Sequence, residues 1–176
     1  MKRYTQINLV EHLINMEYRR SSMGKRRFLV SVIGGHKCGP DEEKMAEDIG
    51  RVIAEEGAVL VSGGLGGIME AATRGAKRSG GLTVGIIPGD DKDAANGYVD
   101  IVIATGIGYS RNTIVASGTD IVVALPGEYG TLSEIGFALA SKKKVYSFGS
   151  WDIPDVIKLD STEDLRSILK DSMMEG

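Results

Sequence analysis

The sequence predicts a doubly wound α/β fold, in which helices cover both faces of a parallel sheet. Short runs rich in valine and isoleucine alternate along the chain with longer segments that have helical spacing. Glycine-rich turns follow most of the short runs, at the places where a strand should lead into a helix. These two observations indicate repeated βαβ units within one domain.

Length and composition fit a single domain and exclude several classes of protein. The 176 residues are enough to bury a substantial core. The 21 basic and 24 acidic residues leave a net charge of −3, which gives no field suited to nucleic acid or an anionic membrane. No apolar run reaches the roughly 18 residues of a spanning helix, and no secretory signal is visible. The single cysteine, Cys38, excludes an internal disulfide and leads us to expect a cytoplasmic protein.

The N-terminal segment is expected to lie outside the main fold. Within Thr5–Tyr18, apolar residues recur at helical spacing from Ile7 to Tyr18, which predicts a helix. The stretch RRSSMGKRR then follows as a basic, solvated joint. We therefore divide the chain into an extension, residues 1–26, and a domain, residues 27–176.

The expected elements of the domain follow one another in a regular order. Short, mostly β-branched strands are predicted at 28–33, 58–62, 82–87, 99–104, 121–125 and 145–148. Helices are predicted at 40–56, from the second glycine turn to 79, at 109–117, from the turn after 121–125 to 141, and from a cap at Asp160 or Ser161. Pro40 marks a helix start because proline is favoured at the first helical position.

The turns after the strands hold the candidate binding residues. In a doubly wound sheet, ligands bind at the carboxyl ends of the strands, where the strand order reverses. The turns there read GGHKCGP (34–40), GGLGG (63–67), PGDD (88–91), TGIGYSRN (105–112) and PGEYGT (126–131). Glycine lets backbone N–H groups approach a ligand, and the N-terminus of the next helix favours an anion. One such turn would be explained equally well by backbone geometry, but several together predict a site for a phosphorylated ligand, which would include Gly34 and Gly35.

Other phosphate, metal and nucleophile motifs are missing. There is no G-x-x-x-x-G-K-[ST] loop, and SGGLGGIME departs from the dinucleotide fingerprint G-x-G-x-x-G at Met69. A dinucleotide is a weaker alternative, since Asp90 and Asp91 end the next strand, where a ribose-binding acid would lie. His12 and His36 form no zinc spacing with the one cysteine, and no G-x-S-x-G occurs. We expect neither a metal ion nor a bound cofactor.

The turn LPGEYGTLSE (125–134) allows two explanations for its last glutamate. Thr131-x-x-Glu134 has the spacing of a capping box, in which the Thr131 side chain accepts from a helical amide and Glu134 accepts from the Thr131 amide. A cap does not explain Gly127 and Gly130, which clear space in front of the helix. A carboxylate at the mouth of a phosphate-sized cavity is also a candidate acid or base.

The same turn carries a resemblance to a known family. PGEYGTLSE resembles the P-G-G-x-G-T-x-x-E signature of the LOG-like (Lonely Guy) superfamily, whose members also carry the label lysine decarboxylase. SGGLGGIMEAATRGA resembles the G-G-G-x-x-G-x-M motif of that family, and the match covers about residues 27–150. The resemblance implies a Rossmann-like domain, usually a homodimer, with a nucleotide site near the dimer contact. Characterised members are phosphoribohydrolases, which cleave a nucleoside 5′-monophosphate into base and ribose 5-phosphate. The decarboxylase label lacks physical support, because no lysine is marked for pyridoxal phosphate.

The resemblance also implies which residues act. Arg111 and Glu134 would be catalytic, since a carboxylate can stabilise positive charge on the ribose or activate water, and a guanidinium can hold a phosphate. A purely structural ion pair between them is the alternative. The implied ligand-binding residues, in the glycine turns and beside the arginine, are Ser62, Gly63, Gly64, Asn112, Gly127, Gly130 and Thr131. The last three would hold the phosphate, and the first three would line the ribose and base side.

Two departures from the family favour a binding protein over an enzyme. The activity motif M-H-x-R-K reads GYSRN here, so Tyr109 or Ser110 replaces the histidine and Asn112 replaces the lysine. Glu128 replaces a signature glycine, and its carboxylate would repel a phosphate unless it points outward. The RN pair is similar to a subgroup that includes the molybdenum cofactor carrier proteins, which bind a phosphorylated pterin without turnover. The sequence therefore predicts a carrier or sensor for a nucleotide-like phosphorylated ligand, with a phosphoribohydrolase as the alternative.

Overall fold

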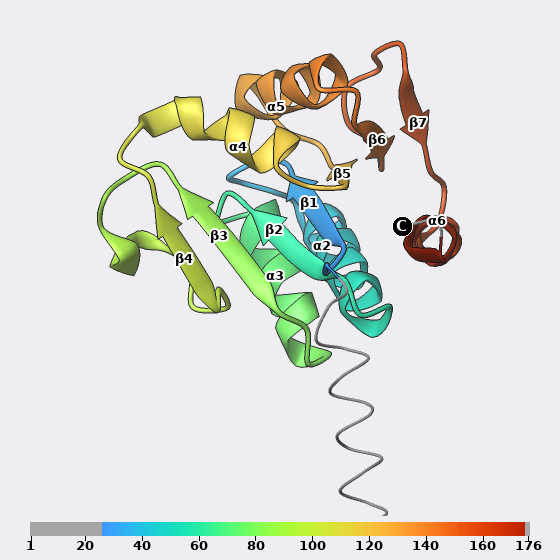
Figure 1. The fold of residues 1–176 in the computed structure, drawn as a ribbon, viewed down its shortest axis with the longest axis horizontal. Helices are drawn as coiled ribbons and strands as arrows, with labels where there is room; N and C mark the ends of the chain where they lie inside the picture. The colour runs from blue at the N-terminus through green and yellow to red at the C-terminus, as the bar shows by residue number, and fades with distance from the viewer. Residues whose placement is uncertain (1–25, 175–176) are drawn as a thin grey trace, which may run out of the picture.

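Seven parallel strands form one sheet in the order β4-β3-β2-β1-β5-β6-β7 (Figure 1). The computed structural model describes residues 26–174. The strands are β1 (Leu29–Ile33), β2 (Val59–Ser62), β3 (Thr83–Ile87), β4 (Ile101–Ala104), β5 (Ile121–Ala124), β6 (Lys144–Ser147) and β7 (Val156–Lys158). The central strands are buried on both faces and consist largely of valine and isoleucine, as parallel strands under two helical layers require.

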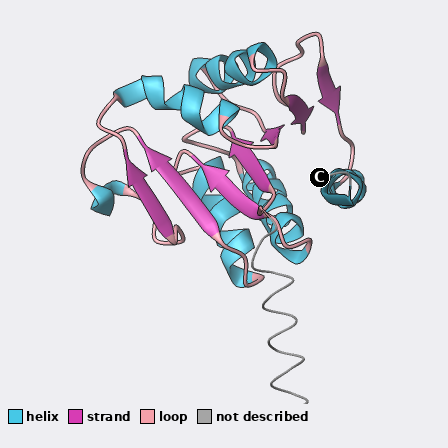
Figure 2. Cartoon of the chain, viewed as in Figure 1, coloured by secondary structure: helices cyan, strands magenta, loops and turns pink. Residues whose placement is uncertain are grey.

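Helices cover both faces of the sheet, as Figure 2 shows. They are α2 (Pro40–Glu55), α3 (Ile68–Arg78), α4 (Asn112–Ser117), α5 (Tyr129–Ala140) and α6 (Thr162–Met174), with short 3₁₀ helices η1 (Lys92–Ala94) and η2 (Gly108–Arg111). The first two and α6 pack on one face, and α4 and α5 pack on the other. The doubly wound α/β prediction is therefore confirmed. None of these helices is long and apolar enough to cross a membrane.

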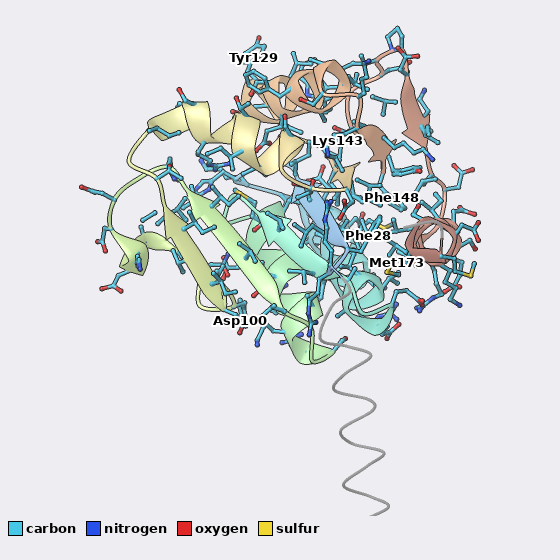
Figure 3. All side chains as sticks on the ribbon, viewed as in Figure 1. Phe28, Asp100, Tyr129, Lys143, Phe148 and Met173 are labelled. Carbon is cyan, nitrogen blue, oxygen red and sulfur yellow. The ribbon has the colours of Figure 1, made fainter. Side chains whose placement is uncertain are left out.

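Two hydrophobic cores result from the alternation of side chains along the strands. Val122 packs into the core under α4 and α5, whereas its neighbour Val123 packs into the core under α2, α3 and α6. Figure 3 shows Phe28, Phe148 and Met173 gathered between the sheet and α6, at the margin of the larger core. The sheet is thus fixed from both sides, and its carboxyl edge is a rigid support for the loops.

The order of elements agrees with the sequence prediction, and the differences are local. The helix predicted at 109–117 is the 3₁₀ helix η2 followed by the short α4. Strand β7 was not predicted, because its three residues are partly or fully exposed and form no apolar run. Of the two proposed caps, Ser161 is the one used: its Oγ accepts from the Asp164 amide at 3.3 Å. The helix predicted within Thr5–Tyr18 lies outside the described residues.

The strand order reverses between β1 and β5. Strands β2 to β4 lie on one side of β1, and β5 to β7 lie on the other. The loops after β1 and β5 therefore lead away to opposite faces and leave a crevice at the carboxyl edge of the sheet. The Gly35 amide donates to the Pro126 carbonyl at 2.9 Å across this crevice, so the two loops are joined at its base.

Candidate functional site

A cavity of about 550 Å³ opens at the crevice between β1 and β5. This volume is within the range of small-molecule sites. The sequence-predicted residues that line it are Gly34, Gly35, Arg111, Asn112, Gly127, Gly130, Thr131 and Glu134. The structure therefore brings together residues from three loops that are far apart in the sequence.

Helix α5 begins in the wall of this cavity. Its first residue is Tyr129, and Glu128 is the N-cap. Thr131 is therefore the third residue of the helix and Glu134 lies well inside it, so the predicted capping box between them is wrong. The proline and glycine of the turn let the helix begin before the threonine, which leaves the first amides of α5 without intrahelical acceptors.

The two glycines of this turn are needed for different reasons. A Cβ on Gly127 would lie 2.2 Å from the Thr131 Oγ1 and 2.7 Å from the Gly35 nitrogen, so no side chain fits. A Cβ on Gly130 would meet only the Asn112 Nδ2, at 4.0 Å, and would otherwise face open space. Gly127 therefore permits close packing of the turn, whereas Gly130 keeps the cavity open.

Arg111 and Glu134 form a buried ion pair on the cavity wall. The Arg111 Nη1 donates to the Glu134 Oε1 at 3.2 Å, and the two residues are only 7% and 6% exposed. Burial raises the pKa of Glu134 to about 7, although the charge and hydrogen bond of Arg111 oppose this shift. Burial likewise lowers the pKa of the Arg111 guanidinium. Near neutral pH, Glu134 can therefore either accept or donate a proton.

The Arg111 guanidinium has further capacity to bind. Among residues 26–174, its buried Nε has no hydrogen-bond partner. Buried polar groups are nearly always paired in folded proteins, so an unpaired one in a cavity wall indicates a place for a ligand or an ordered water. The Arg111–Glu134 pair is therefore a candidate ligand-binding site as well as a structural ion pair.

The residues expected on the ribose and base side, Ser62, Gly63 and Gly64, are not among the residues that line the cavity. A Cβ on Gly63 would be 2.5 Å from the Arg111 Nη2, so this glycine makes room for the guanidinium. The Ser62 Oγ is buried and accepts from the Gly64 amide at 3.1 Å. Ser62 and Gly64 therefore shape the second glycine turn, and Gly63 alone of the three adjoins the arginine.

Asn112 joins the two helices of the site. Its Nδ2 donates to the Ser133 Oγ at 3.1 Å and, more weakly, to the Gly130 carbonyl at 3.4 Å. The residue is buried and also lines the cavity. Its amide therefore positions the first turn of α5 relative to α4, a role that a lysine at this place in the family motif could not fill in the same way.

Some cavity residues were not singled out by the sequence. Lys37 and Glu42 come from the β1–α2 loop and α2, and Leu65 and Met69 come from the second glycine turn and α3. The exposed Lys37 was visible within GGHKCGP, but only the fold shows that it reaches the cavity. The exposed Glu128 lies at the rim, so solvent screens its charge.

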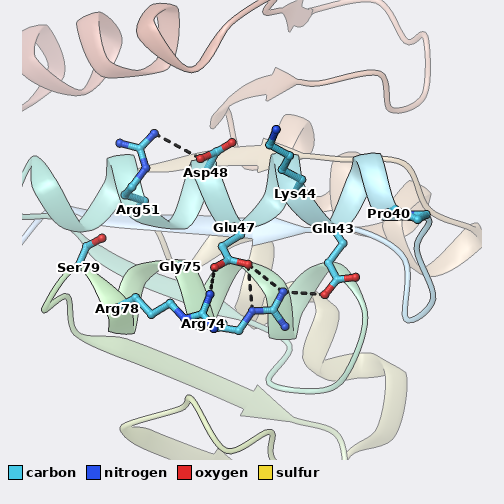
Figure 4. Close-up of a pocket in the computed structure, with 10 residues that line it drawn as sticks. All are labelled: Pro40, Glu43, Lys44, Glu47, Asp48, Arg51, Arg74, Gly75, Arg78 and Ser79. Carbon is cyan, nitrogen blue, oxygen red and sulfur yellow. Dashed lines mark hydrogen bonds and ion pairs between the residues drawn. The ribbon is translucent and has the colours of Figure 1, made fainter.

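A second hollow, of about 430 Å³, lies between α2 and α3 (Figure 4). Most of its charged side chains pair with one another: Arg74 Nη2 lies 2.7 Å from Glu43 Oε1 and 2.9 Å from Glu47 Oε2, and Arg78 also pairs with Glu47. The groove lies on the helical surface, away from the carboxyl edge of the sheet. We interpret it as an ion-pair network that joins the two helices.

Comparison with known proteins places the chain in a family. The SLOG cluster4 family model matches residues 27–175. The chain belongs to the SLOG cluster4 family. An uncharacterised protein from Archaeoglobus fulgidus is 46% identical to this chain over 118 residues. The matched residues cover 67% of this chain and 78% of the relative.

The chain is also similar to an enzyme and to a binding protein whose functions are named. The cytokinin riboside 5′-monophosphate phosphoribohydrolase of Mycobacterium tuberculosis is 35% identical over 95 residues, 52% of this chain and 51% of the enzyme, so the match spans about half of its length. The molybdenum cofactor binding protein of Rippkaea orientalis superposes with a TM-score of 0.79 at 34% identity, covering 85% of this chain and 99% of that one. The resemblance to the LOG-like superfamily, near the molybdenum cofactor carriers, is thereby confirmed.

Proposed function

We propose that this protein binds a small phosphorylated ligand, of nucleoside monophosphate or pterin type, and acts as its carrier or sensor. The observation that carries the proposal is the first turn of α5, which lines the cavity and whose first amides have no intrahelical acceptor. Such amides and the positive end of the helix dipole favour a phosphate. The similar proteins support this class of ligand, since one is named for a riboside 5′-monophosphate and the other for the molybdenum cofactor.

The cavity offers two chemically different ends for such a ligand. The phosphate would lie against the turn at residues 127–131, where Gly130 leaves open space. The planar ring system would lie toward Leu65, Met69 and Tyr109, which supply the apolar and aromatic lining. The buried Arg111 between the two ends can donate to the phosphate or to a ribose oxygen.

A carrier is favoured over an enzyme because the residues beside Arg111 differ from those of the hydrolase motif. Tyr109 or Ser110 stands where the motif has histidine and Asn112 stands where it has lysine, and the amide of Asn112 is already bonded to Ser133. The exposed Glu128 at the rim weakens the attraction for a dianion but does not cancel it, because solvent screens its charge.

Hydrolysis of the N-glycosidic bond is the second candidate, and the Arg111–Glu134 pair favours it. A carboxylate with a pKa of about 7 could stabilise the positive charge that develops on the ribose as the bond from C1′ to the base breaks. Water would then bond to C1′ and lose a proton, while the base leaves with the electron pair of the broken bond and takes up a proton.

Turnover separates the two candidates. A carrier should bind AMP in calorimetry and release no adenine, as measured by chromatography over hours. If the protein is a hydrolase, Arg111→Ala and Glu134→Gln should both abolish release, each ten-fold loss of rate corresponding to about 1.4 kcal/mol. Glu163→Gln, on the exposed first turn of α6, is the matched control and should change neither measurement.

We also propose a cytoplasmic homodimer that forms through one apolar face. Ile101 and Ile103 on β4 are exposed and pair with Val84 and Ile86 of β3, so their side chains point to the α4 and α5 face of the sheet. Exposed apolar groups gathered on one face are typical of an interface. Light scattering should give a molar mass about twice the chain mass of 18.8 kDa. Ile103→Asp should reduce the measured mass to that of one chain. A wild-type monomer at every concentration would rule this interface out.

A further inference from the structure

The loop between β6 and β7 contacts the outer side of the turn that begins α5. It carries Trp151, the single tryptophan of the chain, whose Nε1 donates to the Gly127 carbonyl at 3.0 Å. The indole also stacks on Tyr129, with ring centroids 6.4 Å apart and an interplanar angle of 29°. Figure 3 shows Tyr129 projecting outward from the start of α5. Neither aromatic residue belongs to the signature of the family or to the cavity lining.

We propose that Trp151 is a positioning residue for the phosphate-binding turn, an inference that rests on the proposed function. A trans peptide is planar, so its carbonyl and the following N–H point in opposite directions. The indole holds the Gly127 carbonyl outward, so the Glu128 N–H points away from Trp151. That direction is toward the cavity, which Gly127 and Glu128 both line.

The neighbouring peptide is held in the same manner. The Pro126 carbonyl accepts from the Gly35 amide at 2.9 Å, which fixes the orientation of the Gly127 N–H. Among the described residues, the amides of Gly127 and Glu128 have no hydrogen-bond acceptor, although the carbonyl preceding each of them is bonded. Both carbonyls are thus held by donors, Pro126 by Gly35 at the base of the crevice and Gly127 by Trp151, while two consecutive amides remain free to bind an anion.

Trp151 is suited to orient the turn without being essential for folding. It is 37% exposed, so water can replace its hydrogen bond when the indole is removed. Glycine at position 127 is conformationally permissive, and the peptide that follows it would then sample other orientations. The loop itself is anchored separately, because the Ser150 amide donates to the Ser147 Oγ at the end of β6, at 3.0 Å.

Trp151→Phe is the decisive variant, since phenylalanine keeps a ring for Tyr129 but removes the N–H donor. In calorimetry we expect AMP affinity to fall about three- to ten-fold. Affinity for adenosine, which lacks the phosphate, and the unfolding temperature should not change. Tyr98→Phe, which lies before β4 and outside the cavity lining, is the control for an aromatic replacement and should bind AMP with wild-type affinity.

The outcomes separate this inference from the proposed function. Wild-type affinity for AMP in Trp151→Phe would overturn the positioning role and leave phosphate binding intact. Equal losses of affinity for AMP and for adenosine in this variant would have the same meaning. Failure of the wild-type protein to bind AMP or inorganic phosphate would overturn both. If the variant does not fold, the emission of Trp151 in the wild-type protein gives a second measurement: saturation with inorganic phosphate should shift it, and binding detected by calorimetry without any shift would contradict the proposal.

Discussion

Replacing Gly130 with alanine adds one methyl group at the open side of the cavity. The new Cβ would lie 4.0 Å from the Asn112 Nδ2 and meet nothing closer, and the backbone there does not have a positive φ. Alanine in a helix is more favourable than glycine by about 0.5–1 kcal/mol. For a domain of this size, that gain raises the unfolding temperature by about 1–4 °C.

Alanine at Gly127 should have the opposite effect on folding. Its Cβ would lie 2.2 Å from the Oγ1 of the buried Thr131 and 2.7 Å from the backbone nitrogen of Gly35, and backbone cannot move aside cheaply. Overpacking of this kind costs about 1–3 kcal/mol. We expect the unfolding temperature to fall by about 2–12 °C.

The two variants can be compared by circular dichroism during heating and by calorimetric titration with AMP. Gly130→Ala should be at least as stable as the wild type and bind AMP more than about ten-fold more weakly, because the methyl group occupies the place of a phosphate oxygen. Normal AMP affinity in Gly130→Ala would refute the placement of the phosphate. An undiminished unfolding temperature in Gly127→Ala would refute the packing of the turn.

Further predictions concern the ion pair and its support. Because the folded pKa of Glu134, about 7, lies above its ordinary value of 4.5, the folded state binds more protons between these values, so the free energy of unfolding should fall as pH rises from 4.5 to 7. Urea unfolding at several pH values should show this decline in the wild type and lose it in Glu134→Gln; a flat wild-type profile would count against a buried, protonated carboxyl. Gly63→Ala should displace the Arg111 guanidinium, which lies 2.5–2.6 Å from the new Cβ, and weaken AMP binding, whereas Gly80→Ala would meet no atom and should affect stability alone.

Much of the fold was readable from the sequence because buried parallel strands produce continuous β-branched runs. Strand β7 gave no such signal, since Val156–Lys158 is short and lies at the sheet edge. The cavity position was predictable as well, because ligands of doubly wound sheets bind where the strand order reverses. Family resemblance supplied Arg111 and Glu134, and the structure brings them within 3.2 Å.

The remaining features of the site depend on contacts between distant segments. The spacing of Thr131 and Glu134 matched a capping box, but the glutamate pairs instead with an arginine that is 23 residues away. In the same way, Gly63 is required by the Arg111 guanidinium from another loop. The hydrogen bond from Trp151 to the signature turn joins two loops whose proximity no local pattern records.

A crystal structure of the protein grown with AMP would show where the phosphate of the ligand binds. We expect the phosphate within hydrogen-bonding distance of the backbone amides of residues 127–131, at the N-terminus of α5, with Arg111 beside the nucleotide. A phosphate bound elsewhere on the protein, with this turn unoccupied, would contradict this placement.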